Sequence, residues 1–540
     1  AHQKQFLLKL LFIFAVLLRG FFILNRCYIA FLFCILFIVK ERSNAMDINK
    51  EYSCFERNCI VYQKNIDNEA DYQEALPEYC DDVFKVAKCE VRNYITSVNV
   101  ALNEVKMYGK VEICLTYYNE NSNLCYADFD EEFEKTVEVD SIKTDSAFAC
   151  AICVDKYAGF RVINQRRIDI HSLSTISLSV YDKVTCQNIK SCENSKLRVE
   201  RVKLANIFDS SINKCEFDED IALPADLPEI KRIISSSSFV TLGETKIIQD
   251  KVLIKGTVNL SVLYTSSEDE KICKCDYSFD VSKIVDCVGL SESDIVSVRL
   301  SVGGLYFKLK SSQDNSISHI EAYGDIIIST VFVKEGMCDI VTDGYIPRTK
   351  CNCSYSNIMC NYSGAALNNT FKENLSFEFQ NKLGEIKEVN VRLSDVCCKK
   401  GILEITAFVS VLSINDGVLC SYSESNQFQI DASGFSQAVC GANIISYDYS
   451  LKSDNCIELR LMLNIIGCSF NTVNKNILSE ITPTDKIANS HEMSIYFAKQ
   501  GEEVWNIAKS FSSDIDLIKR DNDLSGDVIE NNSVLLILGV

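Results

Sequence analysis

Histidine, tryptophan and proline are scarce in this chain, with four, one and five copies in 540 residues. The histidines are His2, His171, His319 and His491. The sequence contains no Gly-x4-Gly-Lys-Ser/Thr loop, no Gly-x-Ser-x-Gly elbow and no His-Glu-x-x-His helix. These absences exclude the phosphate-loop NTPases, the α/β-hydrolases and the zinc proteases that carry those motifs. We therefore predict that the chain is not an enzyme, has no catalytic residues and binds no cofactor.

Basic residues are also in deficit, because 55 Lys and Arg face 74 Asp and Glu and give a net charge of -19. A protein that binds nucleic acid needs a basic face to neutralise phosphates, so nucleic acid is excluded as a partner. The hydrophobic fraction of 47% and the charged fraction of 24% are typical of globular protein. At roughly 100–200 residues per domain, the length predicts several domains.

Residues 1–45 differ from the rest in being apolar and basic, with the run QFLLKLLFIFAVLLRGFFILNRCYIAFLFCILFIVK. Polar residues interrupt this run, and its longest clean part, residues 28–39, is shorter than the roughly 18 residues of a membrane helix. The first methionine is Met46. We interpret residues 1–45 as a reading frame upstream of the true start, with a membrane anchor as the alternative. Membrane contact is expected only in the second case.

Cysteine is abundant, with 26 copies, but the copies form no repeating framework. We interpret most of them as reduced, buried, small apolar residues. The pairs Cys273/Cys275 and Cys351/Cys353 are the candidates for zinc, although zinc sites more often use Cys-x2-4-Cys spacing. Oxidative cross-linking is the other alternative. No metal is predicted.

Two long segments of the sequence resemble each other. One begins ALPEYCDD at Ala75 and the other ALPADLPE at Ala222, and both reach a glycine, Gly109 or Gly256, at the same spacing. Around each glycine, apolar residues alternate as on one face of a strand. A third, more divergent copy is GILEITAFVSVLSINDG at residues 401–417. The two glycines are predicted to mark a bulge or a close approach of the backbone, not a ligand site.

These copies predict a mainly β fold with three tandem β-rich units, sandwich-like or barrel-like, followed by a small βααβ module. Four of the five prolines fall at entrances or exits of the copies, as expected of residues that cannot join a central ladder. The predicted boundaries are an apolar leader at 1–45, an extension at 46–74, units at 75–185, 222–340 and 365–480, linkers at 186–221 and 341–364, and the module at 494–538.

The units resemble the SPOCS domain of spore-coat assembly proteins from clostridia. The matching residues are DKVLIKGTVNLSVLYTS at 250–266, YSFDV at 277–281 and GFRVINQRRIDIHSLSTISL at 159–178. The resemblance covers most of residues 75–480 and is weakest in the third copy, where Ile405 replaces the glycine.

The module contains Trp505, the only tryptophan. Apolar residues at 504, 507, 508 and 511 mark one helical face, Asp514 can cap a second helix, and short strands flank both helices. Fewer than fifty residues make a marginal core, so we predict that Trp505 is a structural anchor of that core.

The stretch YFAKQGEEVWNIAKSF, with IKRDNDL and VIENNSVLLIL after it, resembles a LysM domain. Such domains usually bind N-acetylglucosamine-containing glycans in a shallow groove between two loops. The resemblance implies that Asn522 holds the end of the second helix. The implied groove residues are Gly501, Glu502, Glu503 and Val504 on one side, and Asp527, Val528, Ile529 and Glu530 on the other. Two residues depart from the usual pattern: Glu503 replaces a small hydroxyl residue, and Asn532 replaces a glycine before the last strand. An acidic rim of this kind suits a protein partner as well.

The two resemblances together imply a non-enzymatic assembly protein of the endospore coat, tethered to the forespore envelope through the terminal module. Its expected place is the mother-cell cytoplasm at the forespore surface. Its expected partner is a base-layer protein of the coat, a peptidoglycan glycan, or both. The alternative is a membrane-anchored cell-wall protein whose module binds peptidoglycan.

Overall fold

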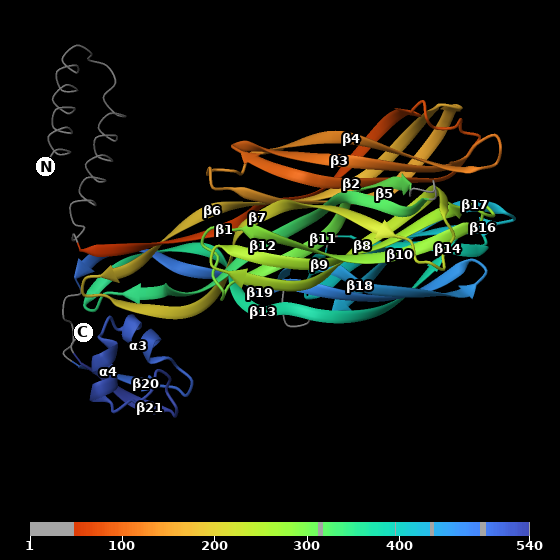
Figure 1. Ribbon diagram of the computed structural model, residues 1–540. Helices are drawn as coiled ribbons and strands as arrows, with labels where there is room; N and C mark the ends of the chain where they lie inside the picture. Colours follow the sequence, from red (N-terminus) through yellow and green to blue (C-terminus); the bar gives the residue numbers. More distant parts are fainter. Residues whose placement is uncertain (1–47, 312–316, 395, 432–436, 487–492, 539–540) are drawn as a thin grey trace, which may run out of the picture.

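The computed structural model describes residues 48–311, 317–394, 396–431, 437–486 and 493–538 (Figure 1). Within these ranges the chain forms 21 strands and two helices, so the mainly β prediction is confirmed. Residues 1–45, predicted to be a leader or an anchor, lie outside the described residues. No helix in the described part of the chain is long and apolar enough to cross a membrane.

Three pairs of long antiparallel strands run along the molecule (Figure 1). They are β1 (Lys50–Ala75) with β6 (Arg167–Cys192), β7 (Lys196–Ala222) with β12 (Ile317–Tyr345), and β13 (Thr349–Glu378) with β19 (Cys456–Lys486). Each pair joins the beginning of a segment to its end, and we call the three successive segments of the described residues units. We call the three long pairs together the stem.

Each unit inserts a three-stranded meander between its two long strands. The meanders are β2 (Lys85–Ala101), β3 (Asn103–Tyr118) and β4 (Leu124–Val139) in the first unit; β8 (Ile230–Ile248), β9 (Lys251–Ser266) and β10 (Ile272–Asp286) in the second; and β14 (Glu385–Leu393), β16 (Ile402–Asn415) and β17 (Val418–Asp431) in the third. A short strand, β15 (Cys397–Lys399), also pairs with β16. The strands β5 (Phe148–Asn164), β11 (Ile295–Ser311) and β18 (Gln437–Ser453) then pair with the returning long strands.

Three segments predicted to be an extension or linkers are strands instead. Residues 46–74 contain most of β1, residues 186–221 contain the end of β6 and most of β7, and residues 341–364 contain the end of β12 and the first half of β13. The reason is long-range pairing, because Lys50 lies opposite Cys192 and Lys196 opposite Tyr345. A local pattern cannot reveal a partner that lies about 140 residues away.

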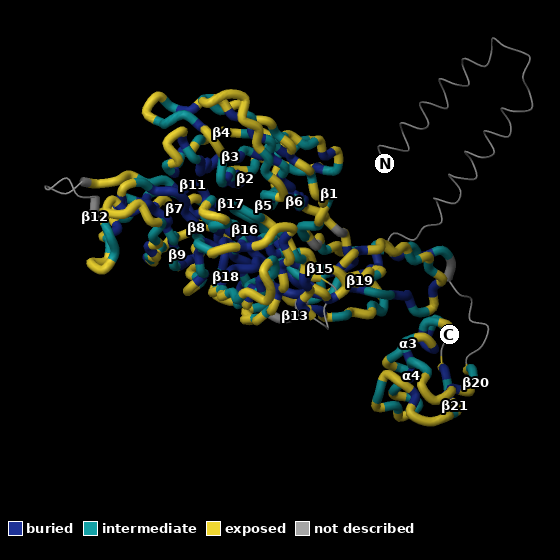
Figure 2. Tube along the Cα trace, turned by 90° about the vertical axis from the view of Figure 1, so that its right-hand side faces the viewer, coloured by how far each residue is buried: buried dark blue, intermediate teal, exposed yellow. Residues whose placement is uncertain are grey.

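The second and third units share one six-stranded sheet, in the order β11-β12-β7-β13-β19-β18, whereas β1, β5 and β6 form a sheet of their own. The pairing in the middle of this sheet is short, because among the described residues β7 and β13 pair only between Leu204 and Tyr362. Buried positions run through the middle of the body and exposed ones cover its outside (Figure 2).

The alternation of side chains between the two faces of each strand explains which residues form the cores. In β9 the side chains of Val252, Ile254, Val258, Leu260 and Val262 are buried and pack with β11 and β12 across the unit. Full burial of one such aliphatic side chain contributes about 1.5–3 kcal/mol. The meander and the long strands of the unit are therefore two layers around one hydrophobic core.

The two repeated glycines occupy equivalent positions. Gly109 lies opposite Ile95 and Gly256 opposite Leu242, and in both cases the neighbouring strand shifts register immediately afterwards. A Cβ at Gly109 would lie 2.3 Å from the ring of Phe133 and 2.8 Å from a backbone oxygen, whereas one at Gly256 would meet its nearest atoms at 3.0 Å. Close approach beside a bulge explains why a residue without a side chain stands there.

The terminal module has the predicted element order, with β20 (Met493–Ala498), α3 (Val504–Ser510), α4 (Ile515–Asp521) and β21 (Ser533–Leu538). The side chain of Asp514 caps α4 by accepting a hydrogen bond of 2.9 Å from the backbone of Asp516. The module lies beside one end of the stem (Figures 1 and 2). Its core consists of Ala498, Val504, Ile507, Ala508, Ile518, Ile529, Leu535 and Ile537, and Tyr345 of β12 is buried in the same cluster.

Candidate functional site

The two loops predicted to line a glycan groove lie side by side and bond to each other. The backbone N–H of Gly501 donates to Ile529 at 2.8 Å, that of Ile529 donates to Glu502 at 2.8 Å, and that of Val504 donates to Asp527 at 2.9 Å. Gly501 has a positive φ of 88°, which favours glycine at this turn. These backbone groups therefore hold the two loops together.

The side chains of the predicted groove differ in how far they are buried and in whether they already have hydrogen-bond partners. Val504 and Ile529 are buried in the core of the module. Glu502 accepts hydrogen bonds of 3.2 Å from the hydroxyl of Tyr496 and from the backbone of Lys499. Asp527, Val528 and Glu530 are exposed, and Asp527 forms an ion pair with Lys519.

Glu503, the acidic residue that departs from the LysM pattern, forms an ion pair with the stem. Both of its carboxylate oxygens accept from the guanidinium of Arg198 on β7, at 2.7 and 3.1 Å. The hydrogen bond from Arg198 lowers the pKa of Glu503. One rim of the predicted groove thus faces another part of the same chain.

Asn522 connects the end of α4 to β21. Its side-chain amide donates to the carbonyls of Ile518 and Leu536 at 2.8 Å each, and its oxygen accepts from the backbone of Leu536 at 2.6 Å. All of its contacts are within the module.

Trp505 is partly buried and packs against the core of the module, and it lies at the contact between the module and the stem, so its predicted role as an anchor of the core stays a prediction. Its indole N–H donates to Asp343 on β12 at 2.9 Å, and its ring meets the ring of Tyr345 edge-on, with 5.2 Å between centroids. Val504, Ile507 and Ala508 form the inward face of α3, and residue 505 is turned about 100° away from Val504, so the indole lies between the module core and the stem.

Asp343 is the centre of this docking contact. Lys509 bonds to its carboxylate at 2.6 Å and the hydroxyl of Tyr355 donates to it at 2.8 Å. Burial alone would raise the pKa of Asp343, but the hydrogen bonds from Lys509, Trp505 and Tyr355 hold that pKa below its usual value.

Charge complementarity extends the docking contact along α4. Lys196 on β7 reaches Asp514 at 3.0 Å and Asp516 at 2.6 Å, and the backbone N–H of Arg348 donates to the carbonyl of Ser512 at 2.8 Å. The stem residues of this contact lie in the segments that were predicted to be linkers. Sequence reasoning missed them because nothing local marks an exposed charged residue as a docking partner.

A second cluster of charges is buried where the three meanders meet. Lys88 bonds to Glu90 at 2.9 Å within β2 and to Glu388 of β14 at 3.3 Å. Arg92 lies 3.3 Å from Glu90 and 3.4 Å from Glu112 of β3. All five residues are less than 10% exposed. Ser235 of β8 joins the cluster by donating to Glu388 at 2.9 Å. The cluster therefore connects all three units.

Glu112 gives this cluster a pH dependence with a defined sign. Burial raises the pKa of Glu112 from 4.5 to about 7, and Arg92 only partly opposes the effect. A carboxyl group whose pKa is higher in the folded chain than in the unfolded chain stabilises the fold fully when the pH is below the unfolded pKa, and this contribution is lost as the pH rises through the folded pKa.

We expect the free energy of unfolding of the original chain to fall by up to roughly 3 kcal/mol between about pH 4.5 and 7 because of Glu112, and we expect Glu112→Gln to lack this fall. Urea unfolding of both proteins across this pH range measures the difference, and parallel profiles of unfolding free energy against pH would contradict the prediction.

The cysteine pairs lie on strands. Cys273 and Cys275 are on β10, and Cys351 and Cys353 are on β13, where the thiol of Cys353 lies 3.3 Å from the carbonyl of Gly344. In the part of the chain that the structure describes, no three His, Cys, Asp or Glu side chains come together as a metal site would require. His171 lies on the surface and bonds to Asp71 at 2.7 Å.

A family model for the SipL SPOCS domain matches residues 229–310. The matched segment runs from the start of β8 into β11, so it contains the whole meander of the second unit. No curated protein and no solved structure matches the chain. The SPOCS resemblance is therefore confirmed for the second unit, and it indicates a protein related to sporulation.

Proposed function

We propose that this chain is a non-enzymatic assembly protein of the bacterial endospore coat in a clostridium-like organism. The SPOCS match at residues 229–310 carries the proposal. We extend the assignment to the other two units because their meanders have the same strand order, each between a pair of long strands. In this proposal the protein acts from the mother-cell cytoplasm at the forespore surface, and its three units form an elongated scaffold.

The terminal module, which we assign as LysM, would be the tether. Its outer sheet face is apolar and uncovered among the described residues: Phe497 is 73% exposed, Ile495 and Val534 are each 60% exposed, and Met493 is 55% exposed. A contiguous exposed apolar face of this kind marks a protein interaction site. Together with the engaged Glu503, it supports a base-layer coat protein as the partner in preference to a peptidoglycan glycan.

The tethering role predicts a localisation defect in sporulating cells. We expect a fluorescent fusion of the chain to surround the forespore, and Phe497→Asp to become diffuse because a charge is placed on the apolar face. Gln500→Asp, an exposed change on the same module, is the matched control and should localise normally. The readout is the ratio of forespore to cytoplasmic fluorescence.

A pull-down on purified peptidoglycan separates the alternatives. The proposal expects no retention of the full chain. Retention that Phe497→Asp leaves unchanged would instead support a wall-binding protein that uses the groove. Normal localisation of the Phe497→Asp variant would contradict the proposed docking face.

A further inference from the structure

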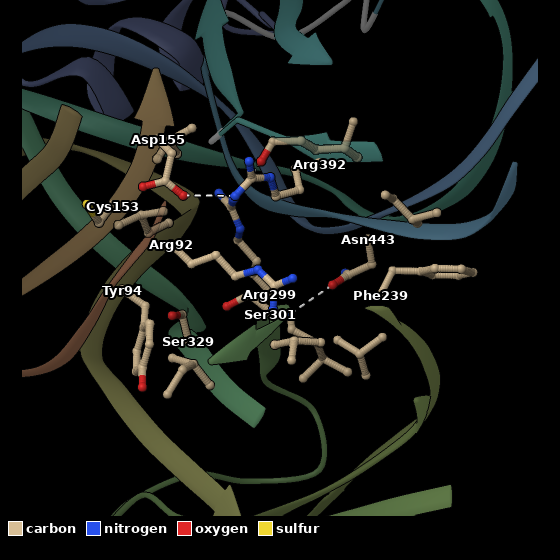
Figure 3. A pocket seen from close by; sticks show the side chains of 18 of the residues that line it. Arg92, Tyr94, Cys153, Asp155, Phe239, Arg299, Ser301, Ser329, Arg392 and Asn443 are labelled. Atoms are coloured by element: carbon tan, nitrogen blue, oxygen red, sulfur yellow. Dashed lines mark hydrogen bonds and ion pairs between the residues drawn. The ribbon is translucent and has the colours of Figure 1, made fainter. Parts of the chain in front are cut away.

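A cavity of about 150 Å³ lies beside the buried charge cluster, between strands of all three units (Figure 3). Its wall carries three arginines, Arg92 from β2, Arg299 from β11 and Arg392 from β14, and a single carboxylate, Asp155 from β5. The arginine side chains gather in the middle of the view, with Asp155 on one side and Asn443 on the other (Figure 3). Glu90 and Glu112 pair with Arg92 from behind the wall and Asp155 pairs with Arg392, so the three guanidinium groups face three carboxylates, of which only Asp155 lines the cavity.

Two of the arginines, Arg92 and Arg392, retain N–H donors for a ligand. A guanidinium has five N–H donors, and Arg92 uses three of them in bonds of 3.3–3.4 Å to Glu90, Glu112 and Ser236. Arg392 pairs with Asp155 at 3.0 Å. Planar guanidinium groups are the donors best suited to the oxygens of carboxylates and phosphates.

Two residues of the wall, Asn93 and Ser238, each carry a buried polar atom without a hydrogen-bond partner among the described residues. Asn93 is 5% exposed and lines the cavity, and its side-chain oxygen has no hydrogen-bond partner among the described residues. Its amide nitrogen donates to Asp155 at 2.7 Å and to Ser172 at 3.0 Å. Because a carboxylate can only accept, this pairing fixes the orientation of the amide, and the oxygen needs a donor from elsewhere.

A route from solvent reaches this place. A neighbouring cleft of about 400 Å³ shares Asp155, Arg392 and Phe408 with the cavity wall. Its other lining residues include the exposed Lys156 and Ser423. The ion pair between Arg392 and Asp155 therefore lies on the wall that the cavity shares with this cleft.

We propose that the cavity binds a small tetrahedral oxyanion that carries its own hydrogen-bond donor, as hydrogen phosphate does. The arginines would bind the unprotonated oxygens, and the side-chain oxygen of Asn93 would accept from the P–OH group. One water occupies about 30 Å³ in the liquid, so the cavity has room for a group of about five heavy atoms. Because the wall comes from three units, a bound anion would also connect them.

The direct test is calorimetric titration of the full chain with inorganic phosphate at low ionic strength, compared with sulfate. Sulfate has the same shape but no hydrogen to donate, so it would leave Asn93 unpaired. We expect saturable binding of one phosphate per chain and at least about tenfold weaker binding of sulfate. Absence of saturable binding, or equal affinity for the two anions, would overturn the assignment.

Variants of Ser238 test whether phosphate binds in this cavity. The hydroxyl of Ser238 lines the cavity without a partner in the described chain. We expect Ser238→Asp to weaken phosphate binding more than about 100-fold by like-charge repulsion, and the neutral Ser238→Asn to bind within a few-fold of the original chain. If Ser238→Asp fails to fold, Arg299→Gln replaces it, with at least about tenfold weaker binding expected. Arg201→Gln, a change of an exposed arginine on the stem, is the control and should have no effect. Unchanged binding in the cavity variant that folds would show that the phosphate binds elsewhere and overturn the proposal.

Discussion

Replacing Glu90 with alanine is expected to destabilise the first unit by about 3–5 kcal/mol, because it leaves buried cations without their shared anion. Lys88, Arg92 and Arg392 lie 2.9, 3.3 and 3.9 Å from the Glu90 carboxylate. Burial of Glu90 would raise its pKa, but these three cations hold that pKa well below its usual value. The measurement is the first transition in a urea unfolding curve of the full chain.

Two further variants make the test specific to the buried charge. Glu90→Gln retains the volume and removes only the charge, so we expect most of the loss to persist. Glu104→Ala on β3 removes a carboxylate that is 41% exposed and lies 3.6 Å from Lys106, and it should cost less than about 1 kcal/mol. If Glu90→Gln were as mild as this control, the cluster would not depend on the charge of Glu90.

Replacing Trp505 with alanine is expected to release the module from the stem without unfolding it. The substitution removes a hydrogen bond to a carboxylate, worth about 1.5–3 kcal/mol, and an aromatic pair worth about 0.5–1.5 kcal/mol. Together these contributions amount to about 2–4.5 kcal/mol and shift the docking equilibrium by a factor of about 30 to 1,500. Hydrogen exchange measures the change, because the backbone N–H of Arg348 is protected by Ser512 across the contact and should exchange faster in the variant.

Aromatic substitutions on the same module supply the controls. Trp505→Phe retains a ring against Tyr345 but loses the bond to Asp343, so an intermediate effect is expected. Phe497→Ala removes an aromatic side chain from the opposite, outer face and should leave the protection of Arg348 unchanged. Loss of the helical exchange protection of α3 and α4 in Trp505→Ala would instead mean that the indole supports the module core.

The meanders could be predicted from the sequence because their signal is local. The alternation around Gly109 and Gly256 marks the buried face of one strand, and the neighbouring strands follow within short turns. The small βααβ arrangement was equally readable, since Asp514 and the spacing from Val504 to Ala508 define its helices within a few residues. In these regions each strand pairs with one that lies nearby in the sequence, and in the module β20 and β21 belong to the same stretch of fewer than fifty residues.

The stem, the docking contact and the buried charge cluster could not be predicted from the sequence, for two different reasons. Strands such as β1 pair with a partner about 140 residues later, and no local period reveals that register. The segment Lys88-Cys89-Glu90-Val91-Arg92 alternates charged and apolar residues, which normally indicates one solvated face, but here other meanders cover that face. Likewise, the residues next to Arg198 and Asp343 in the sequence give no indication that these two side chains contact the module.

The pairing of each first long strand with the last one has a consequence during synthesis on the ribosome. Paired residues of β1 and β6 lie between 92 residues apart (Ala75 and Arg167) and 142 residues apart (Lys50 and Cys192), so at roughly 5–20 residues per second β1 must wait about 5–28 s for its partner. An unpaired strand of 26 residues is a template for the wrong neighbour during that time, including the equivalent strand of another nascent chain. Newly made protein is thus most vulnerable to misassembly three times, once for each unit, and each interval ends when the returning strand arrives.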